Sequence, residues 1–110
     1  MIQMVERRLE DLRAACRRHG VARLELFGSA ASSSAFEPDR SDVDFIVSFP
    51  RDVDLGPWLA RYFDLRDDLR RVLGTPVDLV MEGAIRDPLF AREAARTRQL
   101  IYADQNTEAA

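Results

Sequence analysis

The sequence predicts a small α/β or α+β domain, in which helices pack on a small β-sheet. Two observations lead to this class. Apolar runs of strand length recur along the chain, at residues 21–27, 41–49 and 77–81. Segments with helical periodicity alternate with them, at residues 2–18, 57–73 and from Asp87 onward. An alternation of this kind is typical of helices that cover a sheet.

Length and composition indicate one small domain. The chain has 110 residues, of which 46% are hydrophobic, enough for a single core. We expect the domain to span residues 1–103 and residues 104–110 to form a flexible tail. A formal net charge of −3 argues against general binding of nucleic acids. With one Cys, and without a signal peptide or a run of transmembrane length, we expect a cytoplasmic protein that binds no membrane.

Residues 2–18 predict one amphipathic helix. Its apolar positions recur at helical spacing, at Val5, Leu9, Leu12 and Cys16. We interpret Cys16 as a core residue. Gly20 is suited to a left-handed cap, and we interpret the single histidine, His19, as part of that helix end and not as a catalytic base.

The first predicted strand, residues 21–27, ends in Gly28-Ser29. Glycine allows a backbone turn in which a Cβ would clash, and serine is a good N-cap for a short helix over residues 30–35. Free N–H groups at such a helix start attract phosphate. The serine run 32–34 could also bind phosphate, but a plain loop is the favoured interpretation.

The second predicted strand, residues 41–49, is rich in Val, Phe and Ile, which favours a central place in the sheet. Asp42 and Asp44 are two positions apart, so a strand presents both carboxylates on one face. Two such carboxylates repel each other unless a cation lies between them. Mg²⁺ is usually held by one or two carboxylates together with substrate phosphates. With Gly28-Ser29, this pair predicts a site for a nucleoside triphosphate.

A second D-x-D pair, Asp52 and Asp54, lies in a loop after Pro50, where no strand fixes its geometry, so we reject it as a metal site. The next helix should begin with Pro57 at its first position and should end at Gly74. We expect its apolar stripe to face the core, at Trp58, Tyr62, Leu65, Leu69 and Val72.

The third predicted strand, residues 77–81, carries the carboxylate of Asp78 among apolar neighbours. A surface-facing position on an edge strand would explain Asp78 without a function, but the presence of Asp42 and Asp44 favours a role at the same site. Asp87 and Pro88 predict the start of another helix, and residues 96–102 a short closing strand or turn.

The pattern LFGS, twelve residues (30–41), then DVD within an apolar strand resembles the signature of the DNA polymerase β-like nucleotidyltransferase superfamily. The small size makes the chain most similar to the minimal nucleotidyltransferases, the MNT-type antitoxins paired with HEPN-domain ribonuclease toxins. The resemblance covers roughly residues 21–102. It implies the nucleotidyltransferase fold, with a small mixed β-sheet flanked by helices and the site at one edge.

The resemblance also implies a role for each matching residue. Gly28 and Ser29 would bind the triphosphate, Asp42 and Asp44 would bind Mg²⁺, and Asp78 would be the third catalytic carboxylate of a two-ion site. ATP would be the nucleotide donor. The implied acceptor is a tyrosine hydroxyl of the cognate HEPN toxin, which would receive AMP and thereby be silenced.

Two departures from the family pattern leave alternatives open. The spacer between Ser29 and Asp42 is longer than is usual in minimal members, and the first arginine after the Gly-Ser pair is Arg40. These departures favour an antitoxin that is catalytically weak and neutralises its toxin by binding. Another alternative is a nucleotidyltransferase that acts on a small-molecule hydroxyl.

Overall fold

The computed structural model describes residues 1–32, 37 and 42–104. Its centre is a four-stranded sheet with the strand order β3-β2-β1-β4. The strands are β1 (Arg23–Phe27), β2 (Val43–Ser48), β3 (Val77–Met81) and β4 (Gln99–Ala103). β1 is antiparallel to both of its neighbours, whereas β2 and β3 are parallel. The sheet is therefore mixed, as the resemblance implied, and the strand predicted to be central is central.

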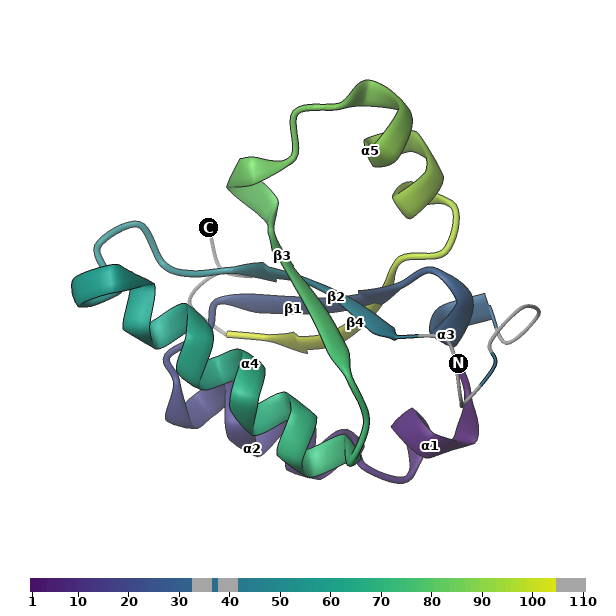
Figure 1. The fold of residues 1–110 in the computed structure, drawn as a ribbon, viewed down its shortest axis with the longest axis horizontal. Coiled ribbons are helices and arrows are strands. Elements are labelled where there is room, and N and C mark those ends of the chain that lie inside the picture. Colours follow the sequence, from purple (N-terminus) through teal and green to yellow (C-terminus); the bar gives the residue numbers. More distant parts are fainter. Residues whose placement is uncertain (33–36, 38–41, 105–110) are drawn as a thin grey trace.

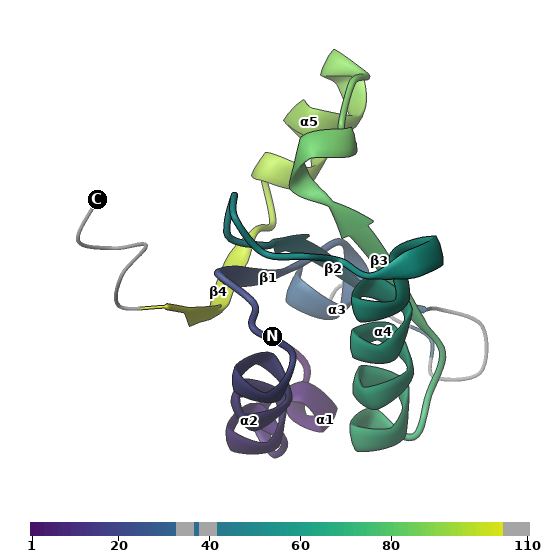
Figure 2. The ribbon, with the colours of Figure 1, turned by 90° about the vertical axis from the view of Figure 1, so that its left-hand side faces the viewer.

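Helices cover the two faces of the sheet unequally. The helices are α1 (Gln3–Glu6), α2 (Leu9–Arg18), α3 (Ser29–Ser32), α4 (Ala60–Leu73) and α5 (Pro88–Ala95), with 3₁₀ turns η1 (Pro57–Leu59) and η2 (Glu82–Ala84). α2 and α4 lie side by side on one face, and α5 stands on the opposite face, above β1 and β2 (Figures 1 and 2). The α5 face is the more open of the two.

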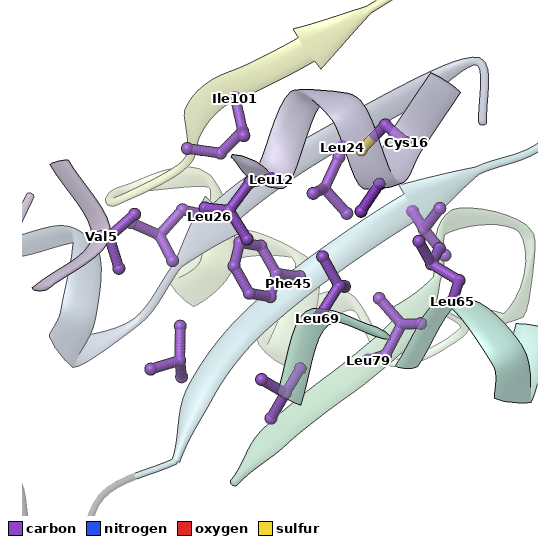
Figure 3. Close-up of a cluster of buried hydrophobic side chains, with 14 of the residues drawn as sticks. Val5, Leu12, Cys16, Leu24, Leu26, Phe45, Leu65, Leu69, Leu79 and Ile101 are labelled. Carbon is purple, nitrogen blue, oxygen red and sulfur yellow. The ribbon is translucent and has the colours of Figure 1, made fainter. Parts of the chain in front are cut away.

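The main core lies between the sheet and the α2–α4 pair (Figure 3). Its largest fully buried side chain, Phe45 of β2, lies among leucines of both helices and of β1. A smaller cluster on the other face consists of Phe27, Ile46 and Ala94, and it attaches α5 to the sheet. Alternation along β2 thus sends Phe45 into the main core and Asp44 and Ile46 toward α5.

The N-terminal segment corrects one prediction, because residues 2–18 form two helices and not one. Arg8 separates them with non-helical backbone angles, φ −113° and ψ 13°. Ile2 donates its N–H to the carbonyl of Ala30 at 2.9 Å, and the Arg8 side chain donates to the carbonyl of Val72 at 3.1 Å. The break lets α1 reach α3 while α2 keeps its contact with α4.

The start of α4 corrects a second prediction. Trp58 and Leu59 have positive φ angles of 56° and 57°, so the regular helix begins at Ala60 and not at Pro57. This left-handed turn takes Trp58 out of the apolar stripe, and its side chain is 93% exposed. The other end is as predicted: Gly74 is the left-handed cap, and its N–H donates to the carbonyl of Arg70 at 2.8 Å.

Other local predictions are confirmed. Cys16 is buried in the main core, and burial raises the pKa of its thiol to about 12. His19 is the C-cap of α2. Asp87 is the N-cap of α5, with its carboxylate accepting from the Leu89 N–H at 2.9 Å. Of the two options for residues 96–102, the strand is observed as β4.

No helix in the described part of the chain is long and apolar enough to cross a lipid bilayer.

Candidate active site

Two of the predicted carboxylates meet across the parallel strands. Asp44 of β2 and Asp78 of β3 are direct partners in the strand register. Asp42 lies two residues before Asp44, at the entrance to β2. Asp44 is partly buried, and Asp42 and Asp78 are exposed. Since Phe45 and Leu79 point into the main core, the carboxylates at positions 44 and 78 leave the sheet on its open face, the one that α5 only partly covers.

The surroundings of Asp44 disfavour its charged form. Burial raises the pKa of the Asp44 carboxyl from 3.8 to about 6, and the negative charges of Asp78 and then Asp42 contribute to the rise. The structure therefore brings the three predicted acidic residues close enough to interact. A cation bound here would remove this repulsion, which makes the donor set chemically suited to a hard divalent ion.

The carboxylates do not form a closed metal cage by themselves. In the part of the chain that the structure describes, no group of three or more His, Cys, Asp or Glu side chains is arranged to hold a metal ion. A Mg²⁺ ion would accordingly need further oxygen ligands. Nucleotide phosphates and water are its usual ones.

The predicted Gly-Ser turn lies beside Asp44. Phe27, the last residue of β1, is the register partner of Asp44, and Gly28 follows with a φ of 75°. A Cβ at Gly28 would lie 2.7 Å from Oδ2 of Asp44, so only glycine lets the backbone pass this close. The short helix α3 begins at the next residue, Ser29.

The backbone of this turn presents free donors. The N–H groups of Ala31 and Ser32 donate to the Gly28 carbonyl at 3.1 and 3.2 Å. By contrast, the N–H groups of Ser29 and Ala30 make no hydrogen bond to any residue within the described ranges. Two unpartnered N–H groups beside a set of carboxylates are suited to a ligand that carries phosphate and a divalent cation.

α5 packs on the end of β1, next to the Gly28 turn. Its Phe90 packs edge to face on Phe27, with ring centroids 5.7 Å apart, directly before the Gly28 turn. Leu89 on the same helix is exposed. The apolar residues of α5 are therefore only partly used for packing on the sheet.

Two further side chains near the site, those of Thr97 and Arg98, were not predicted from the sequence. Oγ1 of Thr97 accepts a hydrogen bond of 2.8 Å from the Gly28 N–H. Arg98 donates to the buried Glu25 at 2.7 Å and to Glu82 at 3.0 Å. The alternation of polar and apolar residues in β1 is a weak signal for Glu25, whereas nothing local distinguishes Thr97 from any loop threonine.

The remaining sequence candidates lie elsewhere. Asp54 accepts from the Gly56 N–H at 2.8 Å in a turn, which is consistent with rejecting the second D-x-D pair as a metal site. His19 contacts Asp68 at 2.9 Å on the opposite side of the sheet. Of the serine run 32–34, only Ser32 lies within the described residues, and the helix predicted over 30–35 is observed as far as that residue.

The family of the chain follows from its sequence match. A family model described as a nucleotidyltransferase domain matches residues 9–101. The chain belongs to the nucleotidyltransferase family. The resemblance predicted from the LFGS and DVD motifs is thus confirmed, and with it the assignment to the transferases.

Individual nucleotidyltransferases share the fold. The protein adenylyltransferase MntA of Thermococcus cleftensis is 36% identical over 87 residues, which are 77% of each chain. A solved structure of a candidate minimal nucleotidyltransferase is 30% identical and superposes with a TM-score of 0.68, covering 86% of this chain and 90% of that one. The MNT antitoxin in complex with a tri-AMPylated HEPN toxin of Shewanella oneidensis is 17% identical, with a TM-score of 0.61 and coverage of 94% and 76%.

Proposed function

We propose that this nucleotidyltransferase is the antitoxin of a toxin–antitoxin pair, and that it transfers AMP from ATP to a tyrosine hydroxyl of a HEPN-domain ribonuclease toxin. The identity to a protein adenylyltransferase supports transfer to a protein acceptor. The fold shared with the MNT antitoxin of a tri-AMPylated HEPN toxin supports the class of partner.

One observation carries the proposal: Asp44, which is the register partner of Asp78, lies against the Gly28 turn. Carboxylates and unpartnered backbone donors are thereby brought to one place on the open face of the sheet. ATP bound with Mg²⁺ needs both, since its phosphates require donors and its cation requires acidic oxygens.

Each residue then has a distinct task. The Ser29 and Ala30 N–H groups and the Ser29 hydroxyl hold the β- and γ-phosphates, which orients pyrophosphate as the leaving group. Asp42, Asp44 and Asp78 would hold Mg²⁺, and in a two-ion site Asp78 would serve the second ion. When bound, Mg²⁺ would neutralise charge on the triphosphate during attack at the α-phosphorus.

The tyrosine hydroxyl approaches the site from its exposed side, where Asp78 lies. The tyrosine oxygen forms a bond to the α-phosphorus while the bond to the pyrophosphate oxygen breaks. Asp78 accepts the hydroxyl proton, since it is exposed to an incoming acceptor and lies next to Asp44. Most of the acceleration comes from positioning and charge stabilisation.

Intact-mass spectrometry tests this proposal. A HEPN-domain toxin is incubated with the purified nucleotidyltransferase, ATP and Mg²⁺. We expect the partner to gain one or more AMP units, and we expect D44N to abolish the gain. D64N is the matched control, because Asp64 is an exposed carboxylate on α4, across the sheet from the site. An unchanged partner mass with the wild-type protein would refute the proposal, and a mass gain with D44N would refute the role of Asp44.

A further inference from the structure

A threonine far along the chain holds the Gly28 turn in place. Thr97 lies between α5 and β4, and its Oγ1 accepts a hydrogen bond of 2.8 Å from the Gly28 N–H. The two residues are 69 positions apart in the sequence. The contact joins the segment after α5 to the turn that approaches the carboxylates.

The Thr97 hydroxyl is itself fixed by its surroundings. The N–H groups of Thr97 and Arg98 both donate to the carbonyl of Ala94, at 3.1 and 3.0 Å. The next side chain, Arg98, makes two bonds to Glu25, of 2.7 and 3.1 Å, and Glu25 is only 8% exposed. A bidentate pair of this kind fixes the guanidinium in one geometry. The acceptor offered to Gly28 is therefore preorganised.

The orientation of the Gly28 peptide decides where its neighbours point. Gly28 has a φ of 75°, and the side of its backbone on which a Cβ would lie faces Oδ2 of Asp44. Because Thr97 takes up the Gly28 N–H, the donors left to a ligand are those of Ser29 and Ala30. A rotation of the Gly28 backbone would change the direction of the Ser29 N–H that follows it.

We propose that Thr97 is a positioning residue for nucleotide binding, acting through the Gly28 peptide and not by contact with the nucleotide. This inference rests on the proposed function, since it assumes that the Gly28-Ser29 turn binds the phosphates. The interaction is the same with substrate bound and in the transition state. Its loss should consequently weaken binding and leave the chemical step nearly unchanged.

The test compares T97V with T97S. Valine has nearly the same shape and offers no acceptor, whereas serine keeps the hydroxyl. We expect T97V to raise the KM for ATP, and the Kd for AMP-PNP with Mg²⁺ measured by calorimetry, about tenfold, with kcat within about twofold of wild type. T97S should stay within about twofold of wild type on all three constants. Melting temperatures identify any loss of folded protein.

The possible outcomes distinguish the positioning role of Thr97 from the proposed function of the protein. If the wild-type protein binds AMP-PNP and T97V binds it equally well, the inference is overturned while the proposed function stands. A fall in melting temperature without any change in Kd or KM would also overturn the inference, because it would show a merely structural role. Absence of both binding and AMP transfer in the wild-type protein would refute the proposed function itself.

Discussion

Asp44 and Asp78 are register partners across the parallel strands β2 and β3, and their carboxylates share the open face of the sheet. Burial of Asp44 first, and then the charges of Asp78 and Asp42, raise the pKa of Asp44 to about 6. An arrangement of this kind costs folding free energy in the absence of a cation. It is expected at a site that is built to bind one.

We predict that D44N is more stable than the wild-type protein at pH 7.5. The folded pKa of Asp44, about 6, lies above its unfolded value of 3.8, so the wild-type protein loses stability as the pH rises from about 4 through 6. Asparagine removes this loss. After allowance for solvent screening, the gain at pH 7.5 should be about 1–2 kcal/mol, and it should nearly vanish at pH 4. Urea unfolding at the two pH values measures it, and a less stable D44N at pH 7.5 would contradict the account.

Magnesium should stabilise the wild-type protein through the same carboxylates. A ligand that binds only the folded state raises the melting temperature as its concentration exceeds its Kd. We expect millimolar Mg²⁺ with AMP-PNP to raise the melting temperature of the wild-type protein and of D64N, and to have little effect on D42N or D44N. Differential scanning fluorimetry makes the comparison, and equal shifts in all four proteins would rule out these carboxylates as the metal ligands.

Replacing Gly28 by alanine should damage the site more than the fold. Alanine at Gly28 would be strained at φ 75°, and its Cβ would meet the Asp44 carboxylate at 2.7 Å. Gly74 is the matched control, because its φ is 68° and no atom lies within 4 Å of a Cβ added there. Both variants should lose about 1 kcal/mol of stability, but only G28A should lose AMP transfer, by at least about tenfold. Urea unfolding measures the backbone strain that both variants share, and initial transfer rates measure the effect of the clash with Asp44, which only G28A has. Full AMP transfer by G28A would contradict the close approach of Gly28 to Asp44.

A buried carboxylate on the other side of the sheet should control acid stability. Asp68 of α4 is 7% exposed, and burial alone would raise its pKa, but hydrogen bonds from Arg18, His19 and Arg71 outweigh burial and lower the pKa to about 2. A folded pKa below the unfolded value of 3.8 means that this stabilisation is present above pH 4 and is lost as the pH falls toward 2.

The corresponding variant is D68N. Since two of the partners are largely exposed arginines, we expect D68N to lose about 1–2 kcal/mol at pH 7, and we expect its difference from the wild-type protein to shrink between pH 4 and pH 2. Urea unfolding across this range provides the measurement. A difference that does not depend on pH would show that Asp68 acts through packing and not through its charge.

The sequence predicts the parts of the site that depend on local spacing. Asp42 and Asp44 are two residues apart in an apolar strand, and side chains at this spacing leave a strand on the same face. Gly28 is predicted for the same kind of reason, since a glycine at a strand end indicates a turn that other residues cannot make. What local patterns cannot give is the register between strands, so the pairing of Asp78 with Asp44 needed the structure or the resemblance.

The features that were missed or wrongly predicted depend on tertiary contacts or on backbone turns that no short motif indicates. Thr97 approaches Gly28 only because α5 and β4 return to β1, and no short motif encodes that return. The N-terminal segment keeps a helical periodicity across its break at Arg8, so periodicity alone predicts one helix. Trp58 fits the stripe of α4 by spacing, but the left-handed turn that removes it is not indicated by Trp58 or Leu59, which rarely adopt positive φ.

The measurement that tests the proposed function most directly is the ribonuclease activity of a HEPN-domain partner after the nucleotidyltransferase has been removed. The HEPN-domain protein is incubated with ATP, Mg²⁺ and either the wild-type nucleotidyltransferase or D44N, then repurified free of the nucleotidyltransferase and assayed. We predict that the partner from the wild-type reaction carries AMP and stays inactive, and that the partner from the D44N reaction is unmodified and active. A HEPN-domain protein that carries no AMP and recovers its activity in both cases would show that the nucleotidyltransferase acts on it by binding alone, and would contradict the proposed function.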